Sequence, residues 1–228
     1  MKINTSSEQL DVEVITPSPV RAPSILFLHG AGTSNKGRAR YIADDLAARG
    51  FSSVLLDFSG QGASSGEMHQ SSLLKREEEA RVVLQNVRFS TPYSIIGSSM
   101  GAYTAIALAP DEQPKSLILF CPAVYDRKVY ALPFDSRFSE GIRRPGGWRD
   151  SDAFEDLSRY TGQLLVVIGS EDRVIPTGLP DLLLTSASNT RRSDLVVIKG
   201  ADHQIHAWLQ THETDRLSVM DRIASFLS

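Results

Sequence analysis

One five-residue stretch, Gly97–Gly101 with the sequence Gly-Ser-Ser-Met-Gly, constrains this chain more strongly than any other. It follows the apolar run 93–96, which predicts a buried strand, and it precedes residues 102–109, which predict a helix. A G-x-S-x-G sequence between a strand and a helix makes a turn so sharp that its central residue takes strained backbone angles. The two glycines relieve the crowding between strand and helix. We therefore expect the Ser99 hydroxyl to stand above one edge of a sheet.

Apolar runs alternate with amphipathic stretches along the rest of the chain. The predicted strands cover residues 10–15, 24–28, 54–56, 93–96, 116–120, 163–168 and 194–198. The predicted helices cover residues 38–49, 73–87, 102–109 and 214–227. This alternation predicts crossover connections, and hence an α/β fold with a mostly parallel central sheet and helices on both faces.

Length and composition indicate a single globular domain over residues 1–228. The net charge of −3 gives no reason to expect nucleic acid or an anionic membrane surface as a partner. No stretch approaches the roughly 20 apolar residues of a membrane span, and we expect no signal region at the N-terminus. The single cysteine, Cys121, suits a reducing compartment, so we expect a cytoplasmic protein. The sequence predicts no oligomeric state.

Residues 122–160 break the alternation of strands and helices. An irregular segment of this length inside a compact domain is typically a lid or a binding element. Since it follows the strand 116–120, it leaves the same sheet edge as the Ser99 turn. We expect a small cap over the site, with Tyr125, Phe134 and Trp148 as candidate substrate contacts. The alternative is a surface excursion whose aromatic side chains fill a small core of their own.

A serine hydroxyl is a weak nucleophile that needs a base to accept its proton, and histidine is suited because its pKa lies near neutrality. His203 directly follows the last predicted strand, at the sheet edge where the strands' carboxyl ends gather. We therefore favour His203 as the base over His206, which lies near the helical tail. We expect Cys121, which follows an apolar run, to be a buried structural thiol and not a nucleophile.

A carboxylate must then hold the imidazole in the correct tautomer. The segment after the strand 163–168 supplies Asp172, with Glu171 as the fallback. Asp202 is a weaker candidate because it adjoins the histidine in sequence, and we interpret Asp57 as a turn-forming residue. The run Glu77–Glu79 predicts a solvated helix face and no metal site.

Three segments in the order Ser, Asp, His resemble the α/β-hydrolase fold family. They are Gly97–Gly101, the Gly-Ser-Glu-Asp-Arg-Val-Ile-Pro sequence at 169–176, and the Gly-Ala-Asp-His sequence at 200–203. Residues 28–32 resemble the oxyanion loop of that family. Residues 57–66 resemble its D-x-x-G-x-G-x-S segment, which is typical of the esterase, monoglyceride-lipase and serine-aminopeptidase-like branch.

The resemblance extends from about residue 10 to residue 228, with a cap shorter than in larger lipases and epoxide hydrolases. The nucleophile position holds Ser99 and not an aspartate, and this residue argues against haloalkane or epoxide chemistry. Within the resembling oxyanion loop, Ala31 is the expected N–H donor, and His29 and Gly30 are candidate substrate contacts.

The resemblance implies a serine hydrolase of the carboxylesterase type, acting on a small or medium acyl ester or thioester through an acyl-enzyme. Ser99 would be the nucleophile, His203 the base and Asp172 its orienting partner. The backbone N–H groups of Ala31 and Met100 would bind the oxyanion, the second from a helix N-terminus. We expect no metal and no organic cofactor. A peptidase, a carbon–carbon bond hydrolase, an acyltransferase and a non-catalytic binding protein are the alternatives.

Overall fold

The computed structural model describes residues 1–18 and 21–228. Within them, eight strands form one sheet in the order β1-β2-β4-β3-β5-β6-β7-β8. The strands are β1 (Lys2–Asn4), β2 (Gln9–Ile15), β3 (Ile25–Leu28), β4 (Ser53–Asp57), β5 (Ser94–Ser98), β6 (Ser116–Phe120), β7 (Gln163–Gly169) and β8 (Arg192–Ile198). β1 and β2 pair antiparallel, as do β2 and β4, and every other pair is parallel. The predicted α/β fold with a mostly parallel sheet is therefore confirmed.

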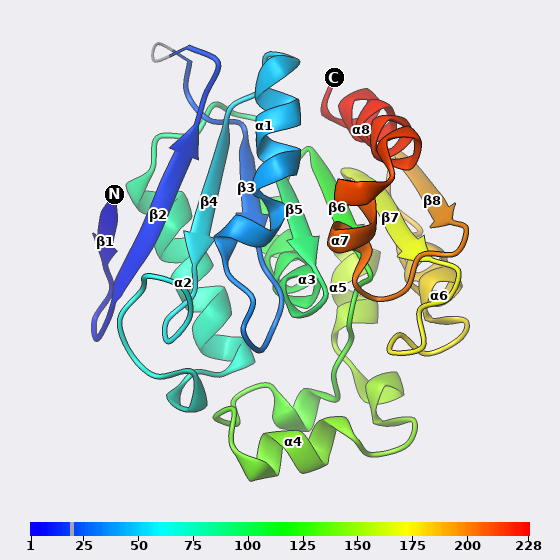
Figure 1. The fold of residues 1–228 in the computed structure, drawn as a ribbon. Helices are drawn as coiled ribbons and strands as arrows, with labels where there is room; N and C mark the ends of the chain where they lie inside the picture. Colours follow the sequence, from blue (N-terminus) through cyan, green and yellow to red (C-terminus); the bar gives the residue numbers. More distant parts are fainter. Residues whose placement is uncertain (19–20) are drawn as a thin grey trace.

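Helices cover both faces of this sheet, with α1 and α8 on one face and α2, α3, α5 and α6 on the other (Figure 1). The helices are α1 (Arg40–Ala48), α2 (Leu73–Asn86), α3 (Met100–Glu112), α4 (Ser136–Ile142), α5 (Ala153–Arg159), α6 (Leu179–Ser186), α7 (Ile205–Thr211) and α8 (Glu213–Leu227). Short 3₁₀ turns occupy Lys36–Ala39, Met68–Gln70, Arg127–Val129 and Gly147–Asp150. Over the described part of the chain, no helix is both long and apolar enough to cross a membrane.

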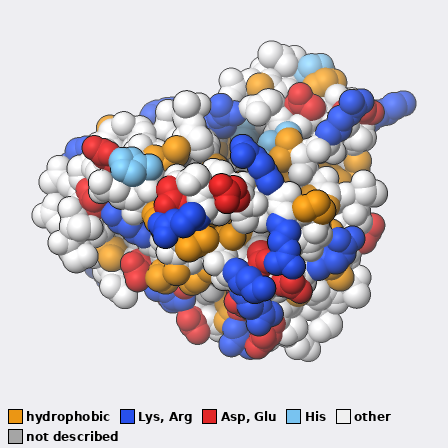
Figure 2. All heavy atoms as spheres, turned by 90° about the horizontal axis from the view of Figure 1, so that it is seen from below, with side chains coloured by type: hydrophobic (Ala, Val, Ile, Leu, Met, Phe, Trp, Pro, Cys, Tyr) orange, Lys and Arg blue, Asp and Glu red, His pale blue; other side chains and the backbone are white. Residues whose placement is uncertain are grey.

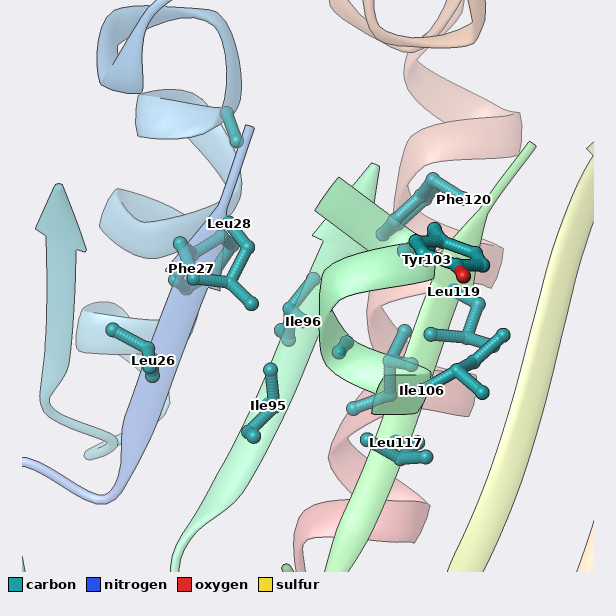
Figure 3. Close-up of a cluster of buried hydrophobic side chains, with 14 of the residues drawn as sticks. Leu26, Phe27, Leu28, Ile95, Ile96, Tyr103, Ile106, Leu117, Leu119 and Phe120 are labelled. Atoms are coloured by element: carbon teal, nitrogen blue, oxygen red, sulfur yellow. The ribbon is translucent and has the colours of Figure 1, made fainter. Parts of the chain in front are cut away.

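The core lies on the central strands, which are mostly apolar because helices shield both of their faces. Every residue of β3 and β6 is buried. Figure 3 shows side chains of β3, β5 and β6 packed together with Tyr103 and Ile106 of α3. By contrast, β2 alternates buried and partly exposed residues near the sheet edge, as its sequence predicts. The short strand β1, which the sequence analysis did not predict, pairs with its outer side.

Most of residues 122–160 lie beyond the carboxyl ends of the strands, at the bottom of Figure 1. This part contains α4 and two 3₁₀ turns. The last part, α5, packs against α3 and forms the crossover to β7, so it belongs to the helical layer of the sheet. Figure 2 views the molecule from this end, where basic and hydrophobic side chains lie side by side. That residues 122–160 act as a cap over the site stays a prediction.

The turn between β5 and α3 has the strained geometry that its sequence predicts. Ser99 adopts φ 51° and ψ −114°, and it is one of three non-glycine residues with positive φ among the described residues. A Cβ atom on Gly97 would lie 2.5 Å from the carbonyl oxygen of Gly101. A Cβ on Gly101 would lie 2.1 Å from the carbonyl oxygen of Leu28, at the end of β3. Both glycines are therefore required by close backbone approach.

Gly101→Ala tests this close approach. The added methyl group would meet backbone atoms of β3 that cannot move without disturbing the sheet, so we expect the free energy of unfolding to fall by about 3 kcal/mol. Urea denaturation measures this change. In the matched control, Gly147→Ala, the new Cβ meets nothing closer than 3.5 Å, and we expect a change within about 0.5 kcal/mol. Equal stability of the two variants would contradict the packing argument.

Candidate active site

Ser99 occupies the tip of the turn between β5 and α3. Its N–H donates to the carbonyl of Phe120 at 2.8 Å, which ties the turn to the end of the neighbouring strand β6. Its carbonyl accepts the N–H of Ala102 at 3.0 Å in the first turn of α3. The backbone is thus held from both sides, and the hydroxyl is left free to meet another side chain.

That side chain is His203, in the connection between β8 and α7. Its Nε2 lies 3.2 Å from the Ser99 hydroxyl oxygen, and its Nδ1 lies 2.8 Å from Oδ2 of Asp172. The three residues come from the ends of β5, β7 and β8, far apart in the sequence. Since parallel strands end at one edge of the sheet, the topology brings their following loops together.

Asp172 is held in place by its own backbone neighbourhood. Its Oδ1 accepts the N–H groups of Val174 and Ile175 at 2.8 and 3.0 Å, which leaves Oδ2 for His203. Burial pushes the pKa of Asp172 upward, but the hydrogen bonds from His203 and the two N–H groups outweigh it and hold the pKa below its usual value. The carboxyl group is therefore ionised at neutral pH and can accept a proton-bearing Nδ1.

The alternative carboxylates lie elsewhere. Asp202 accepts the N–H of Gln204 and points to the surface, and Glu171 is exposed. Asp57 accepts the N–H of Ala63 and pairs with the Lys36 ammonium, which agrees with its interpretation as a turn-forming residue. The geometry thus brings Asp172 alone of these four carboxylates to His203.

A second serine–histidine pair lies directly beside the first. Ser98 Oγ lies 2.7 Å from Nε2 of His206, whose Nδ1 lies 3.1 Å from the Tyr41 hydroxyl. Burial lowers the pKa of His206 to about 4, so the ring is neutral at physiological pH. The sequence analysis placed His206 near the helical tail but did not anticipate this contact. It joins the turn to α7, which begins two residues after His203.

Two cavities meet at Ser99. The larger, of about 400 Å³, includes Ala31, Arg38 and Gln204 in its wall together with His203. The smaller, of about 210 Å³, lies under residues 122–160 and includes Tyr125, Ile142 and Trp148. The smaller one is mostly apolar in its side chains, whereas the larger one carries several polar groups.

The two predicted oxyanion donors border this site. Met100 is the first residue of α3, and Ala31 lies in the wall of the larger cavity with Ser99. Among the described residues, neither of their N–H groups has a hydrogen-bond partner. Two unpartnered N–H groups beside a nucleophile-like hydroxyl are what an oxyanion site requires.

The candidate substrate contacts divide into two groups. Gly30 borders the larger cavity, and Tyr125 and Trp148 border the smaller one. His29 and Phe134 border neither of the two cavities. The His29 ring packs edge-on against Phe58, 5.1 Å between ring centroids, and Phe134 packs against Phe138 inside the 122–160 segment. For these two residues substrate contact is a prediction that the lining of the two cavities does not support.

The thiol of Cys121 lies next to the same site. Its Sγ and the ligand atoms of Asp172 and His203 all lie within 4.8 Å of one another. The residue is 2% exposed, and burial together with the Asp172 charge raises the pKa of the thiol well above its usual value. The thiol is therefore protonated at neutral pH, which agrees with a structural thiol and makes it a weak metal ligand.

The sequence analysis did not identify two buried charged residues of α2 as candidate site residues. Glu79 was expected on a solvated face, but it is 2% exposed and accepts the N–H of Ser59. Arg76 is fully buried behind the loop that carries Ala31. The signal was present in the spacing, because residue 76 falls on the apolar stripe formed by Leu73, Ala80 and Val83.

Comparison with known proteins agrees with this architecture. An uncharacterized protein of Mycobacterium tuberculosis is 25% identical over 213 residues, which cover 90% of this chain and 70% of that protein. The esterase EaEST from Exiguobacterium antarcticum superposes with a TM-score of 0.75 at 18% identity, covering 99% of this chain and 98% of that one. Est1E from Butyrivibrio proteoclasticus, solved with ferulic acid bound, gives 0.74 at 19% identity over 96% and 99%.

A monoacylglycerol lipase from Paleococcus ferrophilus has a TM-score of 0.72 at 16% identity, over 95% of this chain and 99% of that one. At such identities these structures show the fold. The family described as serine aminopeptidase, S33, matches residues 20–144, which is more than half of the chain. The chain therefore belongs to this family of hydrolases within the α/β-hydrolase superfamily.

Proposed function

We propose that this hydrolase is a serine esterase that cleaves a small or medium acyl ester or thioester. The observation that carries the proposal is the continuous contact from Ser99 through His203 to Asp172, at 3.2 and 2.8 Å, where two cavities meet. A hydroxyl, an imidazole and a carboxylate in this order make an activated nucleophile.

The proposed reaction has two halves. His203 Nε2 accepts the Ser99 proton while Oγ attacks the substrate carbonyl, and the resulting oxyanion accepts the N–H groups of Met100 and Ala31. The imidazolium, steadied by Asp172, then protonates the leaving alcohol or thiol as its bond to the acyl carbon breaks. In the second half, His203 takes a proton from water as the water oxygen attacks the acyl carbon. The bond from that carbon to Ser99 Oγ then breaks, the imidazolium returns its proton to Oγ, and the carboxylic acid leaves. The mechanism uses neither a metal nor an organic cofactor.

The two cavities fit the two halves of such a substrate. We assign the acyl group to the smaller cavity, because Tyr125, Ile142 and Trp148 present it with apolar surface. We assign the leaving group to the larger cavity beside Arg38 and Gln204. A volume of about 210 Å³ suits a short or medium acyl chain better than a long one.

A peptidase is the main rival, because the matched family bears the name of an aminopeptidase. An aminopeptidase needs free carboxylates for the substrate's amino group. Asp126 borders the smaller cavity, but its carboxylate accepts the Lys128 N–H and lies 3.5 Å from the Arg144 guanidinium. Those contacts leave it poorly suited to a substrate amine. The esterase and lipase names of the similar structures further favour an ester.

The adjacent serines provide a matched test. We expect Ser99→Ala to abolish turnover of p-nitrophenyl esters from acetyl to decanoyl, and to abolish labelling by a fluorophosphonate, while the fold remains intact. Ser98→Ala should still be labelled, because of the two serines it is Ser99 that contacts His203, whereas Ser98 contacts His206. Turnover should be greatest among the shorter esters. Undiminished turnover by folded Ser99→Ala would refute the proposal, and labelling without turnover of any ester would refute the substrate class.

Asp172→Asn tests the third member of the proposed triad. The amide oxygen can still accept the N–H groups of Val174 and Ile175, so its NH₂ group would face His203 Nδ1. Nδ1 of His203 must then accept a hydrogen bond, which places the ring proton on Nε2. A protonated Nε2 cannot accept the proton of the Ser99 hydroxyl. We expect kcat to fall about 10⁴-fold.

Asp202→Asn is the control for this variant, because it makes the same chemical change directly beside His203. Its side chain can still accept the Gln204 N–H, so we expect kcat close to that of the unaltered enzyme. Equal losses in the two variants would remove Asp172 from the proposed mechanism. Far-UV circular dichroism checks that both proteins are folded.

A further inference from the structure

The most unusual charged group outside the proposed triad is the guanidinium of Arg76. The side chain is 0% exposed, and its carbon Cζ lies 3.9 Å from the centroid of the Phe58 ring. Within the described residues it forms no ion pair, and its Nε and Nη1 have no hydrogen-bond partner. Burial lowers the pKa of Arg76 to about 10, so the group still carries its charge at neutral pH. Burying an unpaired cation destabilises the folded protein, so its presence at this position needs a physical explanation.

The remaining nitrogen of Arg76 shows where that charge is directed. Nη2 donates to the carbonyl oxygens of His29 and Gly30 at 2.8 and 3.0 Å. Both carbonyls belong to the loop that follows β3 and leads to Ala31. The cation therefore lies directly behind the backbone that carries one of the two proposed oxyanion donors.

His29 contacts the same carbonyl oxygen, with its Nδ1 lying 3.4 Å from Nη2 of Arg76. Its Nε2 lies 3.2 Å from the N–H of Phe58, which can only donate, so Nε2 is the acceptor. Burial and the Arg76 charge lower the pKa of His29 to about 3, and a neutral ring must then carry its proton on Nδ1. That Nδ1–H donates to the Gly30 carbonyl at 2.8 Å. The Gly30 oxygen thus receives two buried hydrogen bonds.

The orientation of the Ala31 N–H follows from this arrangement. The Gly30–Ala31 peptide is trans, and a trans peptide points its C=O and its N–H in opposite directions. Fixing the Gly30 carbonyl toward Arg76 therefore directs the Ala31 N–H away from it. Gly30 lies against the turn, since a Cβ on it would be 3.5 Å from Ser99 Cβ, and Ala31 borders the cavity that Ser99 opens into.

We propose that Arg76 is a positioning residue of the oxyanion site: it aims the Ala31 N–H at the reacting carbonyl and places a positive charge behind it. The inference rests on the proposed function, because an oxyanion forms only if Ser99 attacks a carbonyl or an equivalent centre. In the absence of a paired carboxylate, the charge polarises the two carbonyls and with them the peptide that presents the donor. The charge of Glu79 on the same helix favours the charged form of Arg76, but within the described residues no hydrogen bond joins the two side chains.

Arg76→Met and Arg76→Lys test this role. Methionine keeps much of the volume but removes the charge and the donors, whereas the lysine ammonium can still donate to both carbonyls. The readout is the second-order rate constant for fluorophosphonate labelling of Ser99, because its phosphonyl oxygen occupies the oxyanion site whatever the natural substrate is. We expect Arg76→Met to lower this constant by at least about tenfold, and by no more than the roughly 10²–10³-fold cost of deleting an oxyanion donor. Arg76→Lys should recover most of the rate.

Two further measurements separate positioning from general damage. With p-nitrophenyl acetate, kcat should fall in Arg76→Met while KM changes little, and the midpoint of the pH–rate profile should not move, since the His203–Asp172 contact is untouched. Arg81→Met is the matched control, because it removes another arginine of the same helix. Arg81 pairs with Glu77 and Asp111, away from the loop that carries Ala31. This variant should label at the unaltered rate.

Three outcomes would overturn the inference. They are labelling of folded Arg76→Met at the unaltered rate, an equal loss in Arg81→Met, or a failure of both Arg76 variants to fold, which would make the residue purely structural. The proposed function fails in a distinguishable way. If the unaltered protein is labelled at Ser99 but hydrolyses no ester, the substrate class is wrong while the Arg76 test still stands. If it is not labelled at all, both proposals fall.

Discussion

The contact on which the rest of the site depends is the close approach of two backbones, at the end of β3 and the start of α3. No side chain fits between them, since a Cβ on Gly101 would meet the Leu28 carbonyl oxygen at 2.1 Å. This approach sets the loop after β3 directly against the turn that carries Ser99. It therefore brings the loop that carries Ala31 close to Ser99 and to the first residue of α3, Met100. The strain at Ser99 is the local cost of that proximity.

The opposite side of the site is organised by α7 and the short loop before it. His203 contacts Ser99, and His206, one turn further along, contacts the neighbouring Ser98. The two adjacent serines thus meet two histidines from one short segment. His206 is neutral and buried, and it links the turn to Tyr41 of α1. The segment that carries the proposed base is in this way held against the turn by a second hydrogen bond, which limits how far the base can drift from the nucleophile.

Helix α2 carries two buried charged residues next to the loops that follow β3 and β4. The Arg76 cation and the Glu79 carboxylate lie on the helix face that a regular amphipathic pattern reserves for apolar side chains. Such an exception to the pattern is expected where function and stability compete. In this protein both exceptions lie on a helix that packs behind the loops following β3 and β4, where Arg76 bonds the His29 carbonyl and Glu79 the Ser59 N–H.

The sequence by itself determined the α/β architecture, the strained turn and the strand ends that carry Ser99, Asp172 and His203, because hydrophobic period and glycine spacing are local properties. Helix bounds agree to within a few residues for α1, α2, α3 and α8. Only the tertiary structure decided what each side chain meets: His29 and Phe134 turn into aromatic packing, His206 finds Ser98, and Arg76 reaches the loop of Ala31. These contacts join residues as much as 108 positions apart in the sequence. A local hydrophobic pattern cannot predict contacts across such a separation.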